Sequence, residues 1–129
     1  MNSTQLRTKA FIQTCRSISR KYAANGRRLS NHDIVRIAMN QEAPSFFVSL
    51  RQAETCLNNY LTHGYFTTST LPTRQRLWLE LLRILKARDG IRNGLVHRPQ
   101  LAYILSRCSA PSFFMSENYA RKIFYNSLS

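Results

Sequence analysis

The stretch Ala43-Pro44-Ser45-Phe46-Phe47-Val48-Ser49 occurs a second time as Ala110-Pro111-Ser112-Phe113-Phe114-Met115-Ser116. Six of the seven positions are identical, and the seventh exchanges one apolar residue for another. Downstream pairs at the same offset of 67 residues, such as Ala53 with Ala120 and Asn59 with Asn126, match as well. Chance does not give such a match in 129 residues, so we expect an internal duplication.

The chemistry of this stretch predicts a turn between two helices. Proline disfavours a helical conformation for the residue before it, so a helix should end near Ala43 and another near Ala110. Ser49 and Ser116 are suited to cap the next helices, and Gln52 offers Ser49 a capping box. Each Phe can bury about 150–250 Å². We therefore expect six core anchors in the turns, with base stacking or partner binding as the alternative role: Pro44, Phe46, Phe47, Pro111, Phe113 and Phe114.

Outward from the two turns, apolar periodicity predicts six helices and no strand. The expected helices cover residues 5–24, 30–42, 49–62, 72–88 and 116–128, with the fifth in order beginning at Pro99 and ending near Ala110. Asn25-Gly26 and Asp89-Gly90 should end the first and fourth helices, and Asn93-Gly94 should add a turn. The fold class that follows is all-α, as a tandem duplication of a closely packed, three-helix, helix-turn-helix-like unit. The expected repeats cover 1–64 and 71–129, joined by a linker at 65–70, and together form one compact unit.

The same periodicity predicts which faces are buried. In the fourth helix the stripe is Trp78, Leu81, Leu82 and Leu85. The second helix should bury Ile34, Ile37 and Ala38, and the last one Ala120, Ile123, Phe124 and Leu128.

Charge is the strongest compositional signal. The chain holds 19 Lys and Arg against six Asp and Glu, a formal net charge of +13. Residues 1–30 carry seven basic and no acidic side chains, and residues 71–107 carry eight basic and two acidic ones. An excess of this size indicates a polyanionic partner, of which nucleic acid is the commonest. We expect phosphate contacts from Lys9, Arg16, Arg20, Arg27, Arg28, Arg76, Arg83, Lys86 and Arg92.

The second and third helices of each repeat are similar in order and size to a helix-turn-helix, although the turn is longer than usual. If that likeness holds, the helices that start at Ser49 and Ser116 enter the major groove. The outward positions would then include Glu54, Asn58 and Asn126. The expected base-reading residues are Arg51, Gln52, Thr55, Asn118, Arg121 and Lys122. Phosphate gripping without base readout is the alternative.

Other classes of function find little support in the residues. The six carboxylates show no spacing for a metal pair or an acid/base pair, and no phosphate loop or zinc motif occurs. We therefore expect no enzyme, no metal and no cofactor. Three distant cysteines favour a reducing cytoplasm. No run is apolar enough to span a membrane.

The partner expected from these patterns is nucleic acid, DNA rather than RNA. The alternative is an adaptor or accessory subunit that docks on an acidic surface of a larger complex. In that alternative the four turn phenylalanines, or Tyr65 and Phe66, are exposed anchors. A third possibility is membrane-surface binding by the first helix. The sequence leaves the oligomeric state open.

Overall fold

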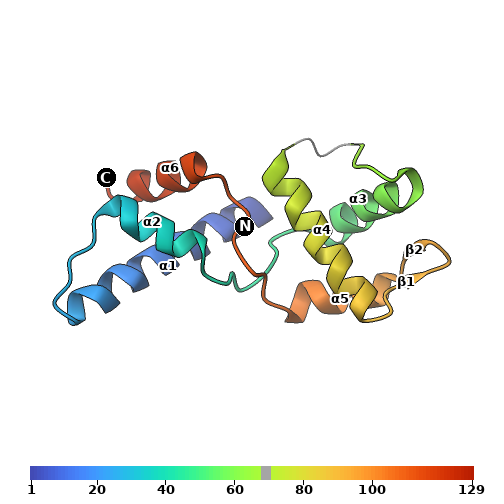
Figure 1. Ribbon diagram of the computed structural model, residues 1–129, viewed down its shortest axis with the longest axis horizontal. Coiled ribbons are helices and arrows are strands. Elements are labelled where there is room, and N and C mark those ends of the chain that lie inside the picture. Colours follow the sequence, from blue (N-terminus) through green and yellow to red (C-terminus); the bar gives the residue numbers. More distant parts are fainter. Residues whose placement is uncertain (68–70) are drawn as a thin grey trace. The chain divides into compact units, whose positions relative to one another are not determined.

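The computed structural model describes residues 1–67 and 71–129, and over these it forms six α-helices and one small β-hairpin (Figure 1). The mainly helical class is thereby confirmed. Residues 68–70, part of the expected linker, lie outside the described residues. The elements are α1 (Ser3–Ala24), α2 (Asn31–Met39), α3 (Leu50–His63), α4 (Pro72–Ala87), β1 (Ile91–Arg92), β2 (Leu95–Val96), α5 (Arg98–Arg107) and α6 (Glu117–Ser127).

The hairpin corrects the expectation that the chain has no strand. Ile91 pairs with Val96 and Arg92 with Leu95 in antiparallel register. Asn93 and Gly94 both have positive φ, at 55° and 74°, as a tight two-residue hairpin turn requires. The Asn-Gly pair had indicated the turn, but each strand is only two residues long and leaves no alternation to detect.

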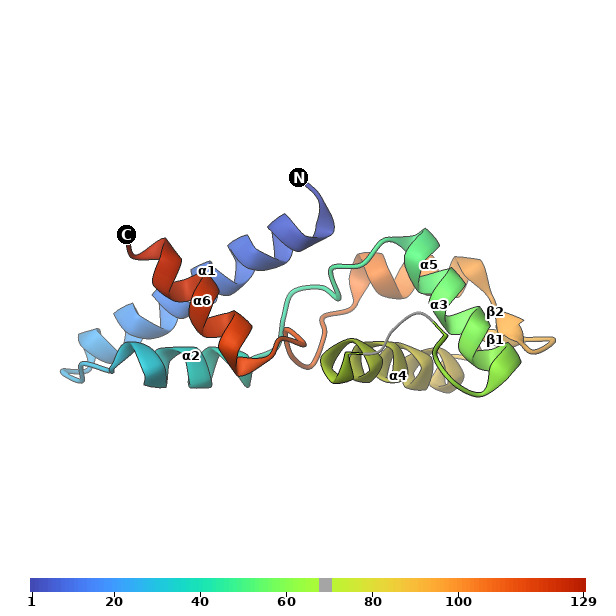
Figure 2. The same cartoon turned by 90° about the horizontal axis from the view of Figure 1, so that it is seen from above.

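The chain divides into two compact units that do not follow its order in sequence. The first unit contains Met1–Pro44 and Ser109–Ser129, and the second contains Ser45–Cys108. Helix α2 therefore packs with α1 and α6, whereas α3 packs with α4, α5 and β2 (Figures 1 and 2). This division differs from the expected 1–64 and 71–129, because the third helix of each expected repeat completes the helix pair of the other.

The two seven-residue stretches have the same local structure. The Ser45 hydroxyl accepts a hydrogen bond from the Phe47 amide at 2.9 Å, and the Ser112 hydroxyl accepts one from the Phe114 amide at 3.2 Å. Phe47 and Phe114 both adopt a left-handed backbone, with φ of 54° and 52°. This conformation is rare for a bulky residue, so its occurrence at both places shows that one turn geometry is used twice.

Serine caps complete both turns as expected. The Ser49 hydroxyl accepts from the Gln52 amide at 3.1 Å and begins α3, and the Ser116 hydroxyl accepts from the Tyr119 amide at 3.2 Å and begins α6. Each serine satisfies one of the amides that a helix start leaves without an intrahelical partner.

The two segments that lead into these turns pair with each other. Ala43 and Ala110 exchange two backbone hydrogen bonds, both of 2.9 Å, in an isolated antiparallel bridge. These residues occupy equivalent positions of the two stretches, and both are buried. The bridge therefore fixes the point from which one segment continues to α3 and the other to α6.

Each unit has its own apolar core. In the first, Phe11 of α1 meets Phe113 edge-on, with ring centroids 5.3 Å apart, beside the buried Cys15. In the second, Trp78 is fully buried on α4. The rest of the expected α4 stripe is buried too, together with Leu77 of the same helix.

One expected core position is wrong, and two others are only half-buried. Leu128 is 55% exposed because α6 ends at Ser127, one residue before it. On α2, Val35 is buried and Ile37 only half-buried, and on α6 Ile123 is half-buried as well.

Candidate nucleic-acid interface

Positive charge is shared almost evenly between the two units. The first unit holds ten Lys and Arg against three acidic residues, and the second holds nine against three. Two ion pairs of these cations with carboxylates are identified within residues 1–67 and 71–129. They join Arg83 to Glu80 and Arg98 to Glu54. The remaining acidic contact joins His32 to Glu117 at 4.0 Å.

Helix α1 carries the most uniform basic face. Lys9, Arg16 and Arg20 are exposed at positions i, i+7 and i+11, which lie on one side of an α-helix and span about 16 Å. None of the three forms an ion pair among the described residues, and α1 has no acidic residue at all. This side is opposite the buried Phe11, Cys15 and Ile18.

Two surface hollows adjoin the basic face of α1. Arg16 and Arg20 line a hollow of about 240 Å³ whose other walls come from α2 and α6. Arg27 and Arg28, in the loop after α1, line a second hollow of about 320 Å³ with Ser19 and Gly26. All five expected phosphate contacts of the first unit are therefore exposed, and they follow one helix and its loop.

The corresponding face of the second unit is less uniform. Arg76, Arg83, Lys86 and Arg92 are all exposed, but the Arg83 Nε donates to the two carboxylate oxygens of Glu80 at 3.1 and 3.2 Å. That hydrogen bond, with the charge attraction second, raises the pKa of Arg83. Glu80 thus occupies hydrogen-bonding capacity that a phosphate would need, and the basic surface of α4 is interrupted there.

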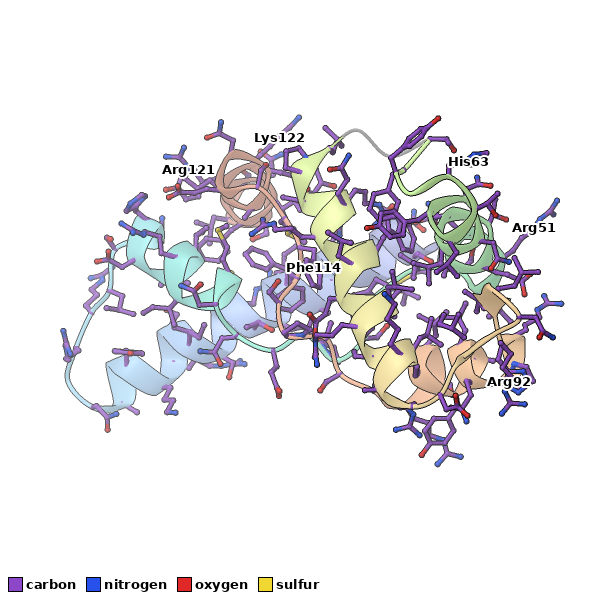
Figure 3. The ribbon with its side chains drawn as sticks, turned by 45° about the vertical axis from the view of Figure 1, so that its right-hand side comes forward. Arg51, His63, Arg92, Phe114, Arg121 and Lys122 are labelled. Atoms are coloured by element: carbon purple, nitrogen blue, oxygen red, sulfur yellow. The ribbon has the colours of Figure 1, made fainter. Side chains whose placement is uncertain are left out.

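The expected base-reading residues fall on two different units. Arg51, Gln52 and Thr55 lie on α3 of the second unit, and all are exposed. Asn118, Arg121 and Lys122 lie on α6 of the first unit, and Figure 3 labels the last two. The Arg121 guanidinium donates a hydrogen bond to the Asn118 Oδ1 at 2.6 Å.

The expected helix-turn-helix pairing of the second and third helices is not found within either unit. The consecutive helices α2 and α3 belong to different units, so neither unit is built from three helices in sequence order. In the first unit the third helix that packs on α2 is α6.

Two of the expected outward residues on α3 have structural partners instead. The Asn58 Oδ1 accepts a hydrogen bond from the Val96 amide at 2.8 Å, which ties α3 to the hairpin. The Glu54 carboxylate lies 3.6 Å from the Arg98 Nε on α5. Asn58 is therefore no candidate for base contact, because its side chain faces the hairpin whose presence the sequence did not reveal.

The phenylalanines of the two turns serve the core rather than a surface. Phe46 and Phe113 are each 2% exposed, and Phe47 and Phe114 are half-buried. Pro44 and Pro111 are exposed. Of the other aromatics considered as anchors, Phe66 stacks on Tyr60 at 4.6 Å, whereas Tyr65 is 62% exposed.

Sequence reasoning missed a cluster of two arginines around one tyrosine in the second unit. The guanidinium carbon of Arg88 lies 4.7 Å from the centroid of the Tyr103 ring, and that of Arg107 lies 5.8 Å from it. Arg88 caps α4, and the other two residues belong to α5. Tyr103 and Arg107 are four residues apart on α5 and so share one face of that helix, whereas Arg88 reaches the same ring only because α4 packs against α5.

Side chains suited to covalent or metal chemistry are not gathered anywhere in the described part of the chain. No group of three or more His, Cys, Asp or Glu there could hold a metal ion. Burial raises the pKa of the Cys15 thiol to about 12, which leaves it protonated and unreactive at neutral pH. No described helix is both long and apolar enough to cross a bilayer.

Comparison of the chain with protein-family models, with curated proteins and with solved structures gives no match.

Proposed function

We propose that the protein binds nucleic acid without catalysing a reaction, and that DNA is preferred over RNA. The observation that carries the proposal is the α1 face and the loop after it. There Lys9, Arg16, Arg20, Arg27 and Arg28 are exposed, and no carboxylate pairs with any of them in the described chain. An ordinary solvated helix face mixes signs, whereas this one leaves five cations available to phosphates.

The proposed contact is mainly to the phosphate backbone. Side chains along about 16 Å of one helix can meet several phosphates, because duplex DNA carries one negative charge per about 1.7 Å of its axis. Arg76, Lys86 and Arg92 would add contacts from the second unit. Base reading by the exposed residues of α3 and α6 is the finer form of the proposal, in which each helix would act from a different unit.

We also propose that the chain arose by duplication of a three-helix element. The repeated stretch and the identical turn geometry at Phe47 and Phe114 support this origin. It would explain why both units carry a basic excess. The free cysteines, of which Cys15 and Cys56 are buried, agree with the cytoplasm as the site of action.

The proposal is tested by the salt dependence of binding to a DNA duplex and to an RNA hairpin. The five contacts of the first unit alone predict that log K falls with log salt at a slope of about −4 to −5, and contacts from the second unit would make the slope steeper. Replacement of Arg16 and Arg20 by Ala should weaken binding and reduce the magnitude of that slope by about 2.

The matched control removes the same net charge from arginines that already have carboxylate partners. The variant Arg83→Ala/Arg98→Ala should change the slope by less than about 1, because Glu80 and Glu54 compensate those cations before binding. Failure of the wild-type protein to bind either probe at about 50 mM salt would overturn the proposal.

The second candidate is an adaptor that docks on an acidic protein surface. It is favoured by the exposure of Tyr65, an aromatic anchor of the type found at interfaces. The nucleic acid that copurifies with the protein distinguishes the two: an adaptor should carry none after a high-salt wash, and Tyr65→Ala should then abolish capture of its partner.

A further inference from the structure

The cluster of Arg88, Tyr103 and Arg107 places two like charges beside one aromatic ring. The two guanidinium carbons cannot be farther apart than the sum of their distances to the ring centroid, which are 4.7 and 5.8 Å. This upper limit is about one Debye length in ~0.1 M salt, so the mutual repulsion of the two charges is only partly screened. In the described chain neither arginine forms an ion pair with a carboxylate, and this includes Asp89, the residue next to Arg88.

Stacking on a ring orders a guanidinium without using its hydrogen-bonding edge. The attraction acts through the flat face of the group, and the N–H donors around its rim remain available. Those donors match the spacing of two phosphate oxygens and can bind them in a bidentate manner. Tyr103 is itself 46% exposed, so a ligand can approach the cluster from solvent.

Both arginines also lie at helix C-termini, where a cation complements the helix dipole. That role requires only positive charge. It does not require a ring, and it does not require the two side chains to meet at the same ring. Arg107 and Tyr103 are an i, i+4 pair of α5, so the feature that goes beyond helix stability is the approach of Arg88, from the end of another helix, to the same ring.

We propose that Arg88, Tyr103 and Arg107 form a phosphate clamp that contacts the phosphodiester backbone of a bound nucleic acid. The clamp rests on the proposed function and adds to it a defined contact on the second unit. Positions 67 residues earlier hold Lys21, Arg36 and Asn40, with no aromatic ring. The clamp therefore belongs to the second unit alone.

The test uses the full chain and variants that keep the charge. Arg88→Lys/Arg107→Lys preserves net charge and the helix-dipole interaction but removes the planar fork, and Tyr103→Leu removes the ring. Each should weaken binding to the DNA duplex by about three- to tenfold. Tyr103→Phe, which keeps the ring, and Arg98→Lys, which alters an arginine paired with Glu54, should bind like the wild type.

Thermal unfolding of each variant separates binding from folding. The clamp predicts that the double lysine variant melts at the wild-type temperature and still binds more weakly. Wild-type affinity in both the double lysine and the Tyr103→Leu variants, together with steep salt-dependent binding by the unmodified protein, would overturn the clamp and leave the proposed function standing. No binding by the unmodified protein would overturn both.

The guanidinium NMR signals of Arg88 and Arg107 identify the source of the phosphate. A shift on adding the duplex, and none with the same concentration of inorganic phosphate, supports contact with the nucleic-acid backbone. An equal shift with inorganic phosphate alone would identify a site for the free ion and overturn the backbone assignment.

Discussion

The two units use the same turn but have different surfaces. A buried phenylalanine and a serine cap direct the chain into α6 in the first unit and into α3 in the second. The first unit adds to this a helix of 22 residues without any acidic side chain. The second has a 16-residue helix in which Glu80 neutralises Arg83, followed by a hairpin that the first unit lacks among its described residues.

This difference teaches that the turn and the charge are independent properties. The turn depends on its backbone conformation and on a buried alanine and a buried phenylalanine, and these are the same in both stretches. The charge depends on exposed positions, where a substitution usually changes stability by less than about 0.5 kcal/mol. Surfaces can therefore diverge while the path of the chain is kept.

The largest expected effect comes from removing a buried aromatic of the first unit. Phe113→Ala should lower the free energy of unfolding by about 3–5 kcal/mol, because it deletes the edge-on contact with Phe11 and leaves a cavity. Urea unfolding should be followed both by circular dichroism and by the fluorescence of Trp78, the only tryptophan of the chain, which lies in the second unit.

If the two units are energetically separate, the dichroism midpoint should fall more than the Trp78 midpoint. Phe114→Ala is the control, and it should cost less because that side chain is half-buried. Equal shifts of both midpoints would show instead that the units unfold as one.

An intermediate effect is expected where the second unit has a feature of its own. Asn58→Leu removes the acceptor of the Val96 amide and should cost about 1–3 kcal/mol, since a partly buried donor is left unpaired. Hydrogen exchange of the Val96 amide should accelerate at the same time. Asn126→Ala, at an exposed position of α6, should stay within about 0.5 kcal/mol, and slow exchange at Val96 in the Asn58 variant would contradict the assignment.

The smallest effects test the feature that the units share. Ser49→Ala and Ser116→Ala should each cost about 1 kcal/mol, because each removes one N-cap hydrogen bond of similar length. Thermal melts of the two single variants check this. A loss confined to one serine would show that the two turns are alike in geometry but not in energy.

Much of the local structure could be predicted from the sequence, because its causes are local. Proline, serine caps and apolar periodicity placed the six helices, and all but one of the expected phosphate contacts are exposed without a carboxylate partner in the described chain. The hairpin was not predicted because its strands are too short to show a pattern. The pairing of Arg83 with Glu80 was overlooked, although the two are three residues apart on the expected fourth helix.

The sequence by itself determined the helices, the two turns and the excess of positive charge. Only the tertiary structure decided which third helix completes which unit, that Asn58 ties α3 to the hairpin, and that Arg88 at the end of α4 lies beside Tyr103 of α5. The physical reason is that α3 and α6 offer similar apolar faces, with Ala53 and Leu57 on one and Ala120 and Phe124 on the other. Either helix could cover either pair by composition alone, so the choice falls to the path of the chain at the bridge between Ala43 and Ala110.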